Sequence, residues 1–131
     1  MRPWIMLLAV FATACGGGGS PNAPTPQPFN QTITGTVSVF GTTFHPISTT
    51  RAGNMRLTLS WSGGVDLDLY LTNPSCELAN LASCQLLAAA DGFVNPEIIT
   101  RSVSTNEAFR VFVDNNSTTQ SANYTLTIHI E

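Results

Sequence analysis

The chain has 131 residues, with five arginines, no lysine and eight acidic residues, and its formal net charge is −3 at pH 7. That length suits one folded domain. Without a basic excess there is no footprint for nucleic acid, so we expect no nucleic-acid partner.

The first residues look like an export signal. Arg2 precedes an apolar run of eleven residues from Trp4 to Ala14, which is shorter than the roughly 20 residues that a membrane-spanning helix needs. The end of this run, from Ala12 to Cys15, resembles the lipobox of bacterial lipoproteins, in which the cysteine is lipidated. We therefore predict a lipoprotein signal peptide over residues 1–14 and a lipid on Cys15, with a plain secretory signal as the alternative.

Residues 15–28 read as a tether. Four glycines and a serine follow Cys15, and prolines then recur at Pro21, Pro24, Pro26 and Pro28. The glycines favour a flexible chain and the prolines an extended one, and neither half can form a core. We predict that this segment holds the domain over residues 29–131 away from a membrane surface.

The first two predicted strands follow the tether. Residues Gln31 to Phe40 alternate, with Ile33, Gly35, Val37 and Val39 on one face. Thr42 to Ile47 forms a shorter strand, and Pro46 within it indicates a sheet edge.

Strict alternation on both sides of Gly63-Gly64 predicts the next two strands. Leucines share one face of residues 54–61 and one face of residues 66–72. Because two glycines can supply a tight reversal, we predict that these strands form a β-hairpin.

Two cysteines, Cys76 and Cys84, remain once Cys15 is assigned to the signal. In an exported chain such a pair is most simply a disulfide. A metal site would need more ligands close by. We expect the bond to close the loop over residues 75–83, with one helical turn at Glu77 to Leu81.

Four more strands are expected at Gln85–Ala90, Glu97–Val103, Ala108–Val113 and Asn123–Ile130. That makes about eight short strands and no convincing helix. The pattern predicts an all-β chain forming one antiparallel β-sandwich.

The run from Arg51 to Thr72 resembles the core of bacterial pre-peptidase C-terminal domains. Residues 108–114 and 121–128 are similar to the last two strands of that family. The resemblance covers roughly residues 40–130 and implies a jelly-roll-like sandwich. Members usually follow secreted proteases, and some relatives bind collagen, polysaccharide or calcium.

Asp66 and Asp68 share one face of their strand, about 7 Å apart along the backbone. Paired carboxylates can hydrolyse glycosides or help to hold Ca²⁺, which takes about six to eight oxygen ligands. One interpretation is a calcium site at Asp66 and Asp68, with further oxygens from Asp91, Asp114 and Asn115. The alternative is that Asp66 and Asp68 are two solvated acids on the surface. No other cofactor is expected.

The aromatic and histidine residues give two further expectations. Trp61 lies on a leucine face and should pack in the core, whereas Phe40 and Phe112 lie opposite the apolar stripes of their strands and could form an exposed binding patch. The alternative for Phe40 and Phe112 is that a loop covers them. His45 and His129 have no nucleophile at a catalytic spacing and are expected at the surface.

These residues predict a lipid-anchored lipoprotein of the bacterial cell envelope, periplasmic or extracellular, with a non-catalytic binding or structural β-sandwich. The expected partners are the membrane, through the lipid, and a polysaccharide or an envelope protein. Two alternatives stay open: an accessory subunit of a separately encoded secreted hydrolase, and a weak hydrolase that uses Asp66 and Asp68.

Overall fold

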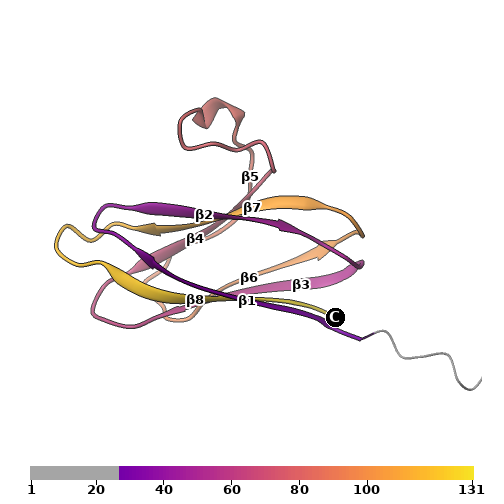
Figure 1. The fold of residues 1–131 in the computed structure, drawn as a ribbon, viewed down its shortest axis with the longest axis horizontal. Helices are drawn as coiled ribbons and strands as arrows, with labels where there is room; N and C mark the ends of the chain where they lie inside the picture. Colours follow the sequence, from indigo (N-terminus) through magenta and orange to yellow (C-terminus); the bar gives the residue numbers. More distant parts are fainter. Residues whose placement is uncertain (1–26) are drawn as a thin grey trace, which may run out of the picture.

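Alternating apolar residues give the chain two sheets that bury one face each. The computed structural model describes residues 27–131, and in it two four-stranded antiparallel sheets lie face to face (Figure 1). The first sheet has the order β1-β8-β3-β6 and the second the order β2-β7-β4-β5. The fold is therefore the predicted all-β sandwich.

The strands keep the predicted order along the chain. Their bounds are β1 (Phe29–Val37), β2 (Thr42–Ser48), β3 (Gly53–Trp61), β4 (Leu67–Thr72), β5 (Leu86–Ala90), β6 (Glu97–Val103), β7 (Ala108–Asn115) and β8 (Ala122–Ile130). Within residues 27–131 the only helical element is the single turn η1 (Leu81–Ser83). The helical turn expected at residues 77–81 is thus displaced toward Cys84.

The core lies between the two sheets and is filled mainly from four strands. Most of its fully buried side chains come from β3, β4, β7 and β8, and they include Met55, Leu57, Leu59, Leu67, Leu69, Leu71, Val111, Val113, Leu126 and Ile130. Trp61 is half-buried and packs against this cluster, as predicted. Its indole Nε1 donates to the carbonyl of Val65 at 2.7 Å.

The predicted hairpin across Gly63-Gly64 is wrong. β3 pairs with β6 and β8, whereas β4 pairs with β5 and β7, so the chain crosses from one sheet to the other at residues 62–66. The amide of Ser62 continues the first sheet by donating to the carbonyl of Asn123 at 3.2 Å. A period of two indicates that one face of a strand is buried, but it does not indicate which strand lies beside it.

The first strand ends earlier than predicted. β1 stops at Val37, and the amide of Gly41 donates to the carbonyl of Ser38 at 3.0 Å to close a turn. Val39 and Phe40 therefore lie in that turn, and Phe40 has a φ of 47°. Pro46 lies in β2, which is an edge strand as predicted.

No helix among residues 27–131 has the length and apolar character needed to cross a membrane. The predicted signal peptide, Cys15 and nearly all of the tether lie outside the described residues.

Candidate functional site

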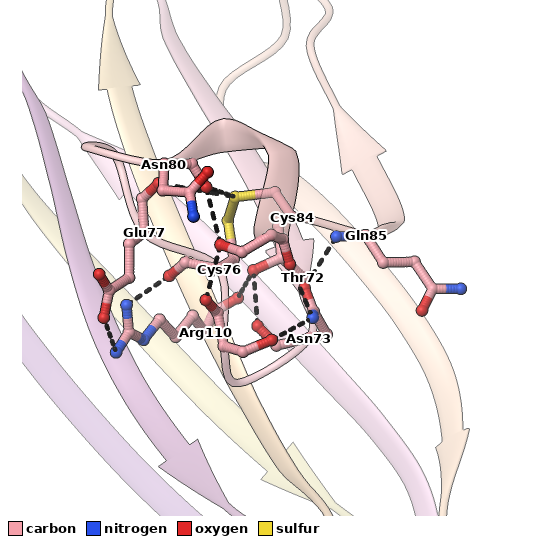
Figure 2. The surroundings of a disulfide bond; sticks show 10 residues. Thr72, Asn73, Cys76, Glu77, Asn80, Cys84, Gln85 and Arg110 are labelled. Atoms are coloured by element: carbon pink, nitrogen blue, oxygen red, sulfur yellow. Dashed lines mark hydrogen bonds and ion pairs between the residues drawn. A yellow bond between two sulfur atoms is a disulfide. The ribbon is translucent and has the colours of Figure 1, made fainter.

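A disulfide-closed loop stands on the outer face of the second sheet. Cys76 and Cys84 form the predicted disulfide, and the loop projects between β4 and β5 (Figures 1 and 2). Arg110 on β7 donates to the carbonyl of Cys76, and its other terminal nitrogen lies 3.8 Å from the carboxylate of Glu77. Arg110 thus connects the loop to the centre of the sheet.

Asn73 holds both ends of the same loop. Its side-chain nitrogen donates to the carbonyl of Ser83 at 3.0 Å, and its side-chain oxygen accepts from the amide of Gln85 at 2.8 Å (Figure 2). These bonds add to the backbone bond from the amide of Asn73 to the carbonyl of Gln85, which is 3.2 Å long, where the chain leaves β4. The loop is consequently fixed to the sheet at both its start and its end.

Between this loop and the sheet lies an apolar groove of about 280 Å³. The loop, β2, β4, β5 and β7 line it with Thr42, Tyr70, Thr72, Cys76, Leu78, Cys84, Leu86, Phe112 and Asp114. Leu78 and Leu86 are large apolar side chains that stay exposed at its rim, and Phe44 is exposed nearby on β2. Sequence patterning missed the two leucines because they lie at the loop and at the end of a short strand, where alternation carries little information.

Only one of the two predicted exposed phenylalanines is exposed. Phe40 is 69% exposed, whereas Phe112 is only 4% exposed. The ring of Phe112 lies 5.8 Å from that of Phe44, and the disulfide loop borders the groove above it. Phe112 therefore forms the floor of the apolar groove and does not belong to an exposed aromatic patch.

An acidic groove of about 540 Å³ lies at the end of the sandwich where three connections meet. Asp66, Asp68 and Asp91 all line it. The other lining residues are Gly64, Val65 and Phe93, and Asn116, Ser117 and Thr118 in the loop that follows β7. Phe93 stands at its rim and is 94% exposed. The two predicted aspartates thus do share a site, and Asp91 joins them.

Asp68 is not a solvated acid. It is 7% exposed, and one carboxylate oxygen accepts from the Tyr70 hydroxyl at 3.2 Å and from the Asn116 amide at 2.7 Å. Burial raises the pKa of Asp68 above its ordinary value, and the charges of neighbouring aspartates add to the rise, while the bond from Tyr70 lowers it. Burial, followed by the charge of Asp68, raises the pKa of Tyr70 to about 12.

The structure brings only some of the predicted calcium ligands together, because Asp66, Asp68 and Asp91 line the acidic groove whereas Asp114 lines the apolar groove. Among residues 27–131 no three or more histidine, cysteine, aspartate or glutamate side chains are grouped to hold a metal. One oxygen of Asp68 already accepts two hydrogen bonds, so part of its capacity to bind a cation is taken. Calcium at Asp66 and Asp68 therefore stays a prediction.

Glu97 is a buried acid that was not among the predicted site residues. It is 3% exposed, and one oxygen accepts from the backbone amide of Leu69 at 3.0 Å while the other has no partner within the described residues. Burial is the main cause that raises its pKa, from 4.5 to about 7. The sequence pattern could have predicted its burial, because Glu97 lies in phase with Ile99 and Val103 on the inner face of β6.

The two histidines have different surroundings. His45, expected at the surface, is half-buried, and its Nε2 shares a hydrogen bond of 2.7 Å with the Tyr124 hydroxyl between the sheets. Burial lowers the pKa of His45. His129 lies on the outer face of β8, where its Nδ1 and Oδ1 of Asn30 are 2.6 Å apart. Neither histidine is hydrogen-bonded to a serine, threonine or cysteine in these bonds.

Three solved structures share this fold. The pre-peptidase C-terminal domain of a Bacillus anthracis collagenase is 17% identical with a TM-score of 0.57, over 76% of this chain and 88% of that one. A periplasmic inhibitor of g-type lysozyme from Aeromonas hydrophila is 10% identical with a TM-score of 0.56, over 78% of this chain and 86% of that one. The Yersinia pseudotuberculosis-derived mitogen is 19% identical with a TM-score of 0.59, over 80% of this chain and 88% of that one.

No family model and no curated protein matches the sequence. The resemblance to pre-peptidase C-terminal domains is thus confirmed at the level of the fold. At these identities the likeness establishes architecture and no activity.

Proposed function

We propose that this protein is a lipid-anchored lipoprotein of the bacterial cell envelope whose β-sandwich binds another envelope macromolecule without catalysing a reaction. The disulfide between Cys76 and Cys84 indicates an extracytoplasmic location. The lipid on Cys15 and the tether up to Pro28 would hold the domain beside a membrane.

The apolar groove under the disulfide loop carries the binding proposal. Its rim leaves Leu78 and Leu86 in solvent, and its floor is the buried ring of Phe112. An exposed apolar cluster on a rigid support is typical of a protein-binding surface. A protein therefore fits this groove better than a polysaccharide, which needs more hydrogen-bonding groups.

An accessory role beside a separately encoded secreted hydrolase uses the same surface, with that enzyme as the partner. A hydrolase using Asp66 and Asp68 has weaker support, because the carboxylate of Asp68 is engaged by Tyr70 and Asn116. To act as a general acid, Asp68 would have to be within hydrogen-bond reach of the substrate atom that it protonates.

The test is capture of partners from detergent-solubilised envelope by the full chain. We compare the wild type with Leu78→Ser/Leu86→Ser, which makes the rim of the apolar groove polar. The control is Phe93→Ser, which removes an exposed aromatic side chain that does not line the apolar groove. We expect a discrete partner with the wild type and Phe93→Ser, and its loss with the leucine pair. A partner retained by the leucine variant would refute the groove as the binding site, and glycoside hydrolysis abolished by Asp66→Asn would favour the enzyme.

A further inference from the structure

The two sheets have four edge strands, and three of them carry a feature that discourages pairing with another chain. β2 contains Pro46, β5 has five residues, and β6 has the charged residues Glu97 and Arg101 on its inner face. Proline, short length and inward-pointing charge are the means by which natural sheets protect their edges.

The fourth edge, β1, has none of these features. It runs for nine residues, Phe29–Val37, and it pairs with β8 in unbroken register. It contains no proline, and the sequence holds no charged residue from 29 to 50. Its other side has no strand beside it among residues 27–131.

The inner face of β1 is also incompletely covered. Ile33 is only half-buried, whereas Leu126 beside it on β8, and Leu59 beyond that on β3, are fully buried in the same row across the sheet. One more strand beyond β1 would extend the apolar row and cover Ile33.

We propose that β1 pairs antiparallel with β1 of a second copy of this chain, joining two four-stranded sheets into one continuous sheet. Pairing about a two-fold axis makes the contact self-complementary. With the axis at Ile33, that residue meets its own copy, Thr32 meets Thr34, and Phe29 meets Val37. On the inner side, the Ile33 pair and the Phe29–Val37 pairs bring apolar side chains together, with Gln31 opposite Gly35 between them, and on the outer side Thr32 faces Thr34 and Asn30 faces Thr36.

The neutrality and self-complementary register of β1 favour a second copy as the occupant. The described residues contain four arginines and eight acids, so two copies carry net charge of the same sign. β1 is a long neutral segment at which two copies can approach without placing like charges together. A tether fixed to one membrane would raise the local concentration of copies, although the pairing itself does not require the lipid.

Cysteine cross-linking of the full chain in cells tests the pairing. Residues opposite each other in an antiparallel pair have Cα atoms about 4.5–5.5 Å apart, which is within disulfide range. We compare Thr32→Cys/Thr34→Cys with Thr58→Cys/Ser60→Cys, which places the same pair on the outer face of the central strand β3. The wild-type lane accounts for any cross-link through Cys15.

We expect a dimer band on non-reducing gels that is several-fold stronger for the β1 variant than for the β3 control and that disappears on reduction. Ile33→Cys alone should also form the dimer, which would assign the register. Equal dimer bands in the two variants would overturn the proposal, as would a cross-linked product with the mass of a different protein.

A second measurement covers the case in which cysteines disturb the strand. Thr32→Lys/Thr34→Lys brings like charges together across the two-fold axis, and sedimentation of the detergent-solubilised full chain should then shift from dimer to monomer. A wild-type chain that sediments as a monomer would refute the pairing. Because Leu78→Ser/Leu86→Ser leaves β1 unchanged, this result is independent of the groove experiment.

Discussion

Gly35 lies on β1 directly against the ring of Tyr124. A Cβ at this position would lie 2.5 Å from the Tyr124 hydroxyl oxygen, and Tyr124 is 4% exposed and hydrogen-bonded to His45. The alternation of β1 predicts that Gly35 faces the core together with Ile33 and Val37. The need for glycine there depends on a tyrosine 89 positions later, which no local pattern reveals.

Gly35→Ala should lower the free energy of unfolding by about 1–3 kcal/mol, because the added methyl group must displace a buried, hydrogen-bonded ring. Urea unfolding measures the change. Gly64→Ala is the matched control, since a Cβ at Gly64 meets no atom within 4 Å. Equal stability of the two variants would show that Tyr124 moves aside at no cost.

Glu97 should make the protein less stable as the pH rises. Its pKa is about 7 in the folded chain against 4.5 as the ordinary value, so the folded state holds a proton that the unfolded state has lost between these pH values. The free energy of unfolding therefore falls from about pH 4.5 to about pH 7 and then levels off.

Glu97→Gln keeps an oxygen for the amide of Leu69 and removes this titration. It should flatten the decline and stabilise the chain at neutral pH by on the order of 2–3 kcal/mol. Urea unfolding across this pH range, with the wild type alongside, provides the comparison. A variant whose stability declines as steeply as that of the wild type would place the titrating proton elsewhere, with Asp68 as the next candidate.

At the scale of elements, the hydrophobic pattern of the sequence predicted where the strands lie along the chain more reliably than it predicted which strands pair. All eight strands were predicted near their observed positions, because most of them alternate and turn residues separate them. The pairing of β3 with β4 was wrong, because their leucine faces meet across the core and not within one sheet. A Gly-Gly pair is compatible with a hairpin turn, but it is equally compatible with a connection that crosses from one sheet to the other, so it does not identify which of the two is present.

The disulfide loop should depend on its covalent closure. Cys76→Ser/Cys84→Ser should lower the free energy of unfolding by up to about 2–3 kcal/mol, the loop-closure entropy for a loop of this size. Urea unfolding measures the loss. Arg110 and Asn73 still hold the loop in this variant, so an unchanged stability would mean that their bonds suffice without the disulfide.

Calcium should leave the melting temperature unchanged. An ion at about ten times its dissociation constant would stabilise the fold by about 1.4 kcal/mol, and extracellular modules bind calcium at about 0.1–1 mM. One oxygen of Asp68 is already taken by two hydrogen bonds, and among residues 27–131 no three acidic, histidine or cysteine side chains are grouped to hold a metal, so we expect no binding in this range and coinciding melts in calcium and in chelator. A rise in the wild type that Asp66→Asn/Asp68→Asn abolishes would establish the calcium site instead.

At the scale of the whole molecule, the sequence predicted the sandwich and the disulfide but not the groove between them. That groove forms because a loop inserted between β4 and β5 lies over β7, and this placement depends on the order of strands in the sheet. Phe112 illustrates the difference, since alternation correctly placed it on the outer face but could not show the cover above it.

Lipidation of Cys15 is the prediction that concerns the molecule's location. Radiolabelled palmitate should enter the wild type and not Cys15→Ser, and only the wild type should fractionate with membranes. Equal labelling of both chains, or a wild type found wholly in the soluble fraction, would contradict the anchor.

The most direct test of the binding proposal is photo-cross-linking in intact cells. A benzoylphenylalanine replaces Leu86 at the groove rim in one full-length variant and Ile98 on the outer face of β6 in the other; both positions are exposed. The account predicts a discrete adduct with one envelope protein from position 86 and none from position 98. Absence of an adduct at 86, or the same adducts from both positions, would contradict it.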